Sequence, residues 1–498
     1  MQPYVIGIDI GTGSTKGVAL DAAGVVIASC QVHYSMQSVQ PGYAEQDAEA
    51  LWQAFAQCLQ QVVTTVGRMP RLVSLSSCMH SIMAVDEQGQ PLTPLISWAD
   101  TRSAAIADEL RASPEGENLY ASTGTPLHSM SPLCKIIWLH RNRPHLFGQA
   151  FKFISVKEYI WYRLFGEYEV DYSIASATGL FNIQTLAWNE LSLQYCHLKE
   201  EQLSQPVATH FLRKGLTPLA VSLTQLQPEV TFCIGASDGC LANVGTHAME
   251  PGVAALTIGT SGAIRVANGV PVINYASMTF NYRLDEQTFI CGGPVNNGGN
   301  VVQWVFKSFL NQPNPSNQDY AILFENVAAV PAGCKGLLCL PYFIGERAPV
   351  WDEKTNGVFI GIRAHHTRDY FMRAALEGVC FALYQVLQIL EAATGPVQQL
   401  NVSGGFIHSR TWMQMLADIT GKKLSLVQTE DASAIGAALL AMKSTGMIDN
   451  YQAFYKQQPE IIAPNAANHQ VYQQQYGVFK NLYGLLKESM HQLYFQNS

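Results

Sequence analysis

Two short glycine-rich segments carry residues that could bind phosphate. The first is Asp9-Ile10-Gly11-Thr12-Gly13-Ser14-Thr15-Lys16, and the second is Gly259-Thr260-Ser261-Gly262. Glycine lets the backbone approach an anion closely, and successive N–H groups of a turn can hold phosphate oxygens together with nearby hydroxyls. Either segment alone could be an ordinary hairpin turn, because short glycine motifs have many false matches. As a pair they indicate a polyphosphate site, with these candidate residues: Thr12, Gly13, Ser14, Lys16, Gly259 and Thr260.

Two aspartates follow apolar strand patterns. Asp9 follows residues 4–8, and Asp238 follows residues 232–236. A carboxylate near phosphates can hold a hydrated Mg²⁺, which keeps several waters and needs few protein ligands. A carboxylate near a substrate hydroxyl can accept its proton during phosphoryl transfer. We therefore expect Asp9 to hold the metal and Asp238 to act as the base and share the metal, with an N-cap as the alternative role for Asp238.

Other segments combine apolar surface with hydrogen-bonding groups, as binding of a polyhydroxylated substrate requires. They give Met79, His80, Trp98, Asp100 and Arg102 as candidate substrate residues. The ordinary alternatives are a loop histidine at His80 and a surface ion pair at Arg102.

Two glycine pairs raise similar alternatives. Asn297 lies in Gly292-Gly293-Pro294-Val295-Asn296-Asn297-Gly298-Gly299, which is either a plain loop or a loop whose amides reach into a cleft. Gly404 and Gly405 follow an apolar strand pattern. Such a pair permits a flat ligand such as adenine to lie on the backbone, but it also suits a strand-to-helix turn.

The elements that position these residues form a mixed α/β chain. The first glycine-rich turn joins strands at residues 4–8 and 17–20, whereas a Walker A loop or a dinucleotide fingerprint would begin a helix. The second turn likewise joins strands at residues 254–258 and 263–267. This weak internal repeat predicts two domains, each with its own phosphate-sized hairpin turn.

Several helices and one further hairpin are also expected. Asp47 should cap a helix whose apolar face is formed by Leu51, Phe55, Leu59 and Val62, and Thr367 should cap a second long helix. Residues 433–442 should form a closely packed helix, and residues 102–226 should be mostly helical. Residues 83–89 suggest a hairpin.

Composition excludes some classes of protein. The chain has 498 residues, 48% of them hydrophobic and 14% charged, so it can bury a large core. A formal net charge of -8 argues against a general nucleic-acid binder. We expect no membrane span, because no apolar run reaches about 18 residues. Eleven irregularly spaced cysteines without a C-x-x-C pair fit reduced thiols and a cytoplasmic location.

Taken together, these residues resemble the FGGY family of carbohydrate kinases from about residue 4 to residue 446. IGIDIGTGSTK resembles the family's first phosphate motif, LTIGTSGAIR its second, and NVSGGFIHS its adenosine motif. Residues 130–139 and 357–377 resemble two further family signatures. Tyr370 departs from the second signature, which usually has a polar residue there.

The resemblance implies an α/β fold of two actin-like (ribonuclease H-like) ATPase domains with a cleft between them, at residues 1–244 and 245–498. It implies ATP and Mg²⁺ as cofactors, with Gly404 and Gly405 at the adenine. Residues 79–81, 97–103, 123–128, 235–239 and 292–299 resemble the family members that act on gluconate. The implied reaction is ATP-dependent phosphorylation of D-gluconate at its C6 hydroxyl, with Asp238 as general base. Because gluconate is an anion, a cation is expected beside it, and Arg102 or Lys135 could supply this charge.

Alternative functions are another FGGY kinase, acting on xylulose or glycerol, and a non-catalytic sugar sensor of the same fold. The presence of Asp9, Asp238 and both turns favours an enzyme. The expected partners are a small sugar acid and ATP, with no nucleic acid and no membrane, and a homodimer is left open.

Overall fold

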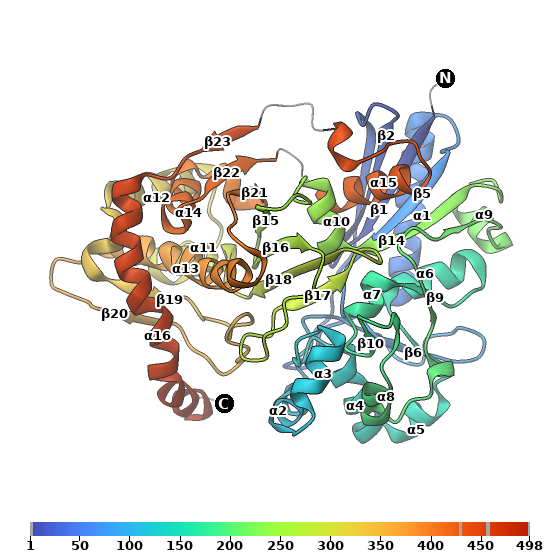
Figure 1. Ribbon diagram of the computed structural model, residues 1–498, viewed down its shortest axis with the longest axis horizontal. Coiled ribbons are helices and arrows are strands. Elements are labelled where there is room, and N and C mark those ends of the chain that lie inside the picture. Colours follow the sequence, from blue (N-terminus) through green and yellow to red (C-terminus); the bar gives the residue numbers. More distant parts are fainter. Residues whose placement is uncertain (1–2, 428–430, 455–458, 497–498) are drawn as a thin grey trace. The chain divides into compact units, whose positions relative to one another are not determined.

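The computed structural model describes residues 3–427, 431–454 and 459–496. The chain divides into two compact units, which Figure 1 shows in the colours of the sequence. The first unit comprises Met1–His247, Ala267–Cys291 and Asp431–Lys456, and the second comprises Ala248–Val266, Gly292–Glu430 and Gln457–Ser498. The domain boundary predicted from the sequence divides the chain once, between residues 244 and 245. The units themselves are interleaved, since two later segments pack with the first unit.

The first unit contains a six-stranded sheet in the order β13-β14-β5-β1-β2-β3. β1 runs parallel to β5 and β5 runs parallel to β14, whereas β1 and β2 form an antiparallel hairpin. The carboxyl ends of three parallel strands therefore meet at one edge. The strands are β1 (Tyr4–Ile10), β2 (Ser14–Asp21), β3 (Val26–His33), β5 (Leu72–Ser77), β13 (Leu212–Arg213) and β14 (Thr231–Ser237).

Helices cover both faces of this sheet. Side chains alternate between faces along a strand, and the even-numbered residues of β1 share a core cluster with helix α1 (Ala48–Val66). Gly7, on the other face, lies so close to helix α15 (Ala432–Ser444) that a Cβ atom there would come within 1.8 Å of the Ala434 carbonyl oxygen. The close packing predicted for residues 433–442 is therefore confirmed.

Helix α1 confirms its prediction in detail. Asp47 is its N-cap, and the carboxylate accepts hydrogen bonds from the N–H groups of Glu49 and Ala50. The predicted apolar face is buried throughout. Thr367 likewise occupies the N-cap position of α13 (Arg368–Thr394), but its side chain makes no capping hydrogen bond among the described residues, so that part of the prediction is wrong. Helix α13 is also long and apolar enough to span a membrane, yet 78% of its apolar window is buried inside the protein, as in a core helix.

The remainder of the first unit is mostly helical between residues 102 and 226, as predicted. The hairpin expected at residues 83–89 is confirmed by an antiparallel bridge between Val85 and Pro91, and β6 (Met83–Val85) also pairs with β8 (Lys152–Ile154). Sequence shows the turn residues but not the distant partner strand. The helices are α2 (Ala104–Ala112), α3 (Gly116–Thr123), α4 (Pro132–Asn142), α5 (Pro144–Gln149), α6 (Val156–Phe165), α7 (Tyr172–Ser176), α8 (Glu190–Cys196), α9 (Pro218–Thr224) and α10 (Asp238–Gly245). The short strands are β4 (Glu45–Gln46), β7 (Leu95–Ile96), β9 (Glu169–Asp171), β10 (Phe181–Asn182), β11 (Ala187–Trp188), β12 (Gln205–Val207) and β17 (Phe280–Arg283).

The second unit repeats the central motif of the first. Its strands follow the order β18-β16-β15-β21-β22-β23. β15 forms an antiparallel hairpin with β16 and runs parallel to β21, just as β1 does with β2 and β5. The strands are β15 (Val253–Ile258), β16 (Gly262–Asn268), β18 (Phe289–Val295), β19 (Leu338–Leu340), β20 (Val358–Ile360), β21 (Gln399–Ser403), β22 (Lys423–Leu426) and β23 (Glu460–Ile462). The remaining helices are α11 (Gly299–Trp304), α12 (Asn317–Ala329), α14 (Arg410–Thr420) and α16 (Ala466–Gln496).

Candidate active site

The first glycine-rich turn connects β1 to β2 and is braced on its carbonyl side. The Tyr34 hydroxyl donates to the Gly11 carbonyl at 2.6 Å, and Gln46 Nε2 donates to the Thr12 carbonyl at 2.8 Å. The Tyr34 N–H donates to the Gly13 carbonyl at 3.1 Å. In a planar trans peptide the C=O and N–H point in opposite directions. The N–H groups of Thr12 and Gly13 therefore point away from these partners, which is the orientation that an anion-binding turn needs.

Asp9 and Asp238 belong to the same edge of the first sheet. The register pairs Asp9 of β1 with Ser76 of β5, and Ser76 with Ala236 of β14, so the three strands end level with one another. Ser76 Oγ donates a hydrogen bond to Asp9 Oδ1 at 2.6 Å. This carboxyl edge of parallel strands is the usual place for ligands in α/β sheets.

A β-bulge re-aims β14 just before Asp238. The pairing of β14 with β5 shifts between Cys233 and Ala236, and Gly235 lies between them with φ 70°. A Cβ atom at Gly235 would lie 1.8 Å from the Leu75 carbonyl oxygen. Only glycine combines this backbone angle with this approach.

The capping role considered for Asp238 belongs to its neighbour. Ser237 is the N-cap of α10, and its side chain accepts a hydrogen bond from the Cys240 N–H. Asp238 is the first residue of the helix, and its Oδ1 accepts the adjacent Gly239 N–H at 2.7 Å. The carboxylate is partly exposed at the strand edge.

The electrostatics of this edge fit a divalent cation. Burial raises the pKa of Asp9, while the Ser76 hydrogen bond and the charge of Lys16 act in the opposite direction. Burial also raises the pKa of the Cys78 thiol, and the carboxylates of Asp238 and Asp9 both add to that rise. The carboxylates of Asp9 and Asp238 therefore both lie close enough to the Cys78 thiol to raise its pKa. The described residues contain no group of three or more metal-ligating side chains.

Ser14 and Lys16 lie on β2 and have protein partners. Gln31 Nε2 donates to Ser14 Oγ at 2.9 Å. Lys16 Nζ lies 3.1 Å from Asp431 Oδ1, and both side chains are more than a quarter exposed. Exposed ion pairs contribute little stability, so Lys16 could exchange this partner for a phosphate at small cost.

Trp98, predicted as a substrate residue, contacts the first glycine-rich turn. Its indole Nε1 donates to Thr12 Oγ1 at 2.9 Å. An oxygen that accepts this bond still keeps its own O–H to donate. The contact therefore fixes the direction in which the Thr12 hydroxyl can serve a ligand.

Asp100 and Arg102 form an ion pair with each other. Arg102 donates to Asp100 through Nε at 2.8 Å and Nη2 at 2.7 Å, and it also pairs with Glu45 at 2.5 Å. The guanidinium carbon lies 3.6 Å from the centroid of the Tyr43 ring. Asp100 is fully buried and also accepts the Ala44 N–H. These contacts hold the β4–β7 region, and the part of either residue in substrate binding stays a prediction.

His80 has partners at both ring nitrogens. Nδ1 lies 2.7 Å from the Ala177 carbonyl oxygen, and Nε2 lies 3.0 Å from the Tyr282 hydroxyl. The carbonyl can only accept, so Nδ1 donates to it, whereas the hydroxyl of Tyr282 can either donate to Nε2 or accept from it. His80 also has φ 65°, an uncommon value outside glycine, and its neighbour Met79 is partly buried.

Lys135 cannot meet a substrate carboxylate as it is placed. Its side chain is fully buried, and Nζ donates to the carbonyls of His80, Ser97 and Met130 at 2.6, 2.7 and 2.8 Å. Burial lowers the pKa of Lys135 to about 7, and the three carbonyls match the three protons of its ammonium form. Lys135 thus ties together three loops of the first unit.

The second glycine-rich turn, in the second unit, repeats the design of the first. The N–H groups of Gly299 and Asn300 donate to the carbonyls of Gly259 at 2.7 Å and Thr260 at 3.1 Å. The N–H groups that follow those carbonyls must point to the opposite side. Both turns are therefore braced through their carbonyls, by different parts of the chain.

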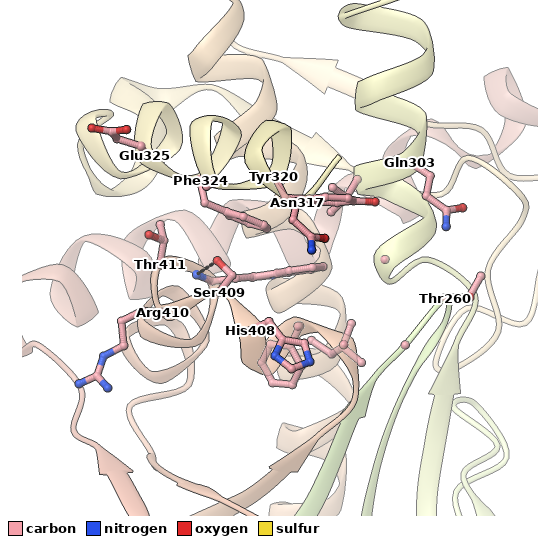
Figure 2. A pocket seen from close by; sticks show the side chains of 18 residues that line it. Thr260, Gln303, Asn317, Tyr320, Phe324, Glu325, His408, Ser409, Arg410 and Thr411 are labelled. Carbon is pink, nitrogen blue, oxygen red and sulfur yellow. Dashed lines mark hydrogen bonds between the residues drawn. The ribbon is translucent and has the colours of Figure 1, made fainter. Parts of the chain in front are cut away.

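A cavity of about 940 Å³ lies beside this second turn (Figure 2). Figure 2 shows residues of α12 on one side, residues 408–411 on the other, and Thr260 with Gln303 at one end. The Phe324 and Trp412 rings stack at 6.2 Å with 29° between their planes. The volume and aromatic walls suit a nucleoside. Among the lining residues, Gly259, Thr260 and Gly405 were predicted, whereas sequence reasoning missed Gln303, Asn317, Tyr320, Phe324 and Trp412.

Gly404 and Gly405, the two glycines predicted to lie at the adenine, have different structural roles. Gly404 has φ 96°, and a Cβ there would lie 2.4 Å from the Ile258 carbonyl oxygen, so it permits the close approach of β21 to β15. A Cβ at Gly405 would meet nothing within 4 Å, and Gly405 lines the cavity. Only Gly405 therefore leaves open space for a ligand.

Asn297 is fully buried and its amide is engaged. Nδ2 donates to the Gly345 carbonyl at 2.9 Å and to Glu346 Oε2 at 3.1 Å, while Oδ1 accepts the Phe343 N–H at 3.2 Å. It joins the 292–299 loop to residues 343–346. Contact between Asn297 and a substrate stays a prediction.

Comparison with known proteins gives a consistent result. A model of the N-terminal domain of the FGGY family of carbohydrate kinases matches residues 4–245, and a model of the C-terminal domain matches residues 254–445. Gluconokinase from Bacillus licheniformis is 39% identical over 458 residues, which are 91% of this chain and 89% of that protein. Xylulose kinase from Staphylococcus epidermidis is 28% identical over 98% of both chains. The crystal structure of gluconate kinase from Lactobacillus acidophilus superposes with a TM-score of 0.93 at 30% identity, covering 99% of this chain and 100% of that one.

Proposed function

Because the chain belongs to the FGGY family of carbohydrate kinases and has their two-domain, actin-like ATPase fold, we propose that it phosphorylates D-gluconate at the C6 hydroxyl with ATP as the donor. The observation that carries the choice of gluconate is the identity of 39% with a gluconokinase, against 28% with a xylulose kinase. The segments of the first unit that resemble gluconate-specific members support the same choice.

Asp238 is the general base of this proposal. It stands at the carboxyl edge of the first sheet, partly exposed, with capping left to Ser237. Its carboxylate would accept the proton of the C6 hydroxyl as that oxygen attacks the γ-phosphorus. Phosphoryl transfer depends mostly on positioning and on stabilising charge, so a weak base suffices.

The braced turns supply the positioning. The N–H groups of Thr12, Gly13 and the second turn would bind phosphate oxygens, assisted by the Thr12 hydroxyl and Lys16. The base of ATP would lie in the cavity beside Gly405, where Phe324 and Trp412 offer flat apolar surface. Asp9, with Asp238, would hold Mg²⁺, whose charge offsets that of the phosphates.

Two observations support a cytoplasmic location in this proposal. All eleven cysteines are free thiols, as a reducing compartment would keep them. Among the described residues, the one helix that is both long and apolar enough to span a membrane has 78% of its apolar window buried inside the protein.

The substrate is tested by a panel of sugars with release of ADP as the readout. D-gluconate, D-xylulose and glycerol are offered at equal concentrations with Mg-ATP, and kcat/KM is determined for each. The proposal expects gluconate to give the highest value. A higher value for xylulose would replace gluconate by the alternative that the xylulose kinase relative suggests, while leaving the kinase assignment in place.

A further inference from the structure

The backbone of residues 298–300 is seated directly on the second phosphate turn. Besides the two N–H donations described above, a Cβ at Gly298 would lie 2.8 Å from the Ser261 carbonyl, and a Cβ at Gly299 would lie 2.7 Å from the Gly259 oxygen. No side chain fits between the two segments. The direction of the turn's N–H groups therefore depends on where this backbone is held.

A buried carboxylate holds the chain immediately before Gly298. Glu346 is 1% exposed, and its Oε1 accepts the N–H groups of Asn296 at 2.5 Å and Arg347 at 2.9 Å. Its Oε2 accepts Asn297 Nδ2 at 3.1 Å. The Glu346 backbone is itself fixed, because it exchanges two hydrogen bonds with Asp352 at 3.0 and 2.9 Å.

Arg347 holds the same stretch of chain, residues 295–297, which we call the corner. Its Nε donates to Asn296 Oδ1 at 2.7 Å, and its Nη2 donates to the Val295 carbonyl at 3.2 Å. Glu346 and Arg347 together thus hold three successive residues, 295–297, that lead into Gly298. Hydrogen bonds with a charged partner are about twice as strong as neutral ones, so this corner is well determined.

We propose that Glu346 is a positioning residue for nucleotide binding, which acts through Asn296 and Asn297 to keep residues 298–300 against the second phosphate turn. The inference rests on the proposed function, since it takes that turn as a site for the phosphates of ATP. Glu346 lines no part of the nucleotide cavity and touches the turn only through the intervening chain.

The charge state of Glu346 gives the proposal a distinctive signature. Burial raises its pKa to about 7, although three N–H donors and the Arg347 guanidinium favour the anion. Glu346 also raises the pKa of the buried Tyr342, which is neutral at these pH values. When Glu346 is protonated, its O–H would face the Asn297 N–H, and two donors cannot form a hydrogen bond. Residues 295–297 would then be held less firmly. Affinity for nucleotide should therefore fall as pH drops through about 7.

Stability should respond to pH in the opposite sense. The pKa of Glu346 in the folded protein lies above the usual value of about 4.3 for an unfolded chain. Its protonation therefore stabilises the fold fully below about pH 4.3, and this contribution is lost as pH rises through about 7. A purely structural role would make binding and stability change together, whereas this proposal has them diverge.

The test compares Glu346→Gln with Glu377→Gln. Glu377 is an equally buried carboxylate of the second unit that pairs with Arg373 on α13, so it controls for the loss of a buried charge. The Kd of Mg-ATP is measured by calorimetry at pH 8 and pH 6, together with KM and kcat. The wild type and Glu377→Gln should both weaken by up to about 10-fold at pH 6, the ratio of ionised fractions for a pKa near 7. Glu346→Gln should be weak at both pH values, with KM for ATP raised more than kcat is lowered.

The expected loss has a direct chemical cause. In Glu346→Gln the new amide places N–H against the Asn297 N–H. A second change at Asn297 could not repair this contact, because the same amide nitrogen also donates to the Gly345 carbonyl at 2.9 Å. If Glu346→Gln does not fold, Arg347→Lys carries the same test, because lysine cannot reproduce the forked contact with Asn296 and Val295.

The proposal is overturned if Glu346→Gln, or Arg347→Lys in its place, binds Mg-ATP as the wild type does at both pH values. This outcome leaves the kinase assignment intact, provided that the wild type binds ATP and phosphorylates a sugar. A folded wild type that does neither overturns the proposed function and this inference together.

Discussion

Replacement of Lys135 by methionine should loosen three loops at once. Methionine fills a similar volume, but it cannot donate to the carbonyls of His80, Ser97 and Met130, which lie 2.6–2.8 Å from Nζ. Each hydrogen bond to a charged group contributes about 1.5–3 kcal/mol, or about 4.5–9 kcal/mol for the three, although the Ser97 carbonyl keeps a second bond from the Asp100 N–H at 3.2 Å. Removal of a buried ammonium recovers several kcal/mol of desolvation. We expect the free energy of unfolding to fall by about 3 kcal/mol.

Urea unfolding followed by tryptophan fluorescence measures this loss, with Lys480→Met as the control because Lys480 is exposed on α16. Steady-state kinetics should show kcat/KM for gluconate falling by about 10-fold or more, since small displacements of binding groups are costly. The loss for ATP should be smaller. A Lys135→Met protein with wild-type stability and wild-type kinetics for gluconate would refute the reasoning, because the three carbonyls would then need no ammonium.

Three further predictions address the remaining groups. Asp238→Asn should lower kcat by about 10²–10⁴-fold while calorimetry shows ATP binding retained; near-normal turnover would end its assignment as base. Asp9→Asn should lose most activity and regain part of it at high Mg²⁺, and a magnesium titration with unchanged apparent affinity would argue against a metal role. Trp412→Ala removes the ring stacked on Phe324 and should raise the Kd of ATP by about 10-fold, since stacking of a base is worth about 1–3 kcal/mol; an unchanged Kd would place the base elsewhere.

Local patterns were sufficient to predict the strands that flank the two glycine-rich turns and the strand that precedes Asp238. The hairpins at residues 4–20 and 254–267 follow from apolar runs interrupted by small residues, and β14 follows from the apolar run before Asp238. The cap at Asp47 and the buried face of α1 follow in the same way from spacing along one helix. Each of these features is decided by neighbours within a few residues.

Partners from distant parts of the chain could not be predicted. His80 contacts Tyr282, which lies 202 residues away, and the Asn297 amide is held by residues 343–346. The sequence shows the charge of Lys135 but not the carbonyls that consume its protons. The α12 wall of the cavity beside the second glycine-rich turn was missed for the same reason, because Tyr320 and Phe324 look like ordinary helix residues until the fold brings them opposite Trp412.

The central claim is that the γ-phosphoryl group of ATP is transferred to the C6 hydroxyl of D-gluconate. The most direct test incubates the protein with Mg-ATP and gluconate labelled with ¹³C at C6, and examines the product by ¹³C and ³¹P NMR. The account predicts one phosphate coupled to the labelled carbon, formed in equal amount to ADP. Release of ADP without a phosphorylated gluconate, or a phosphate on any other carbon, would contradict it.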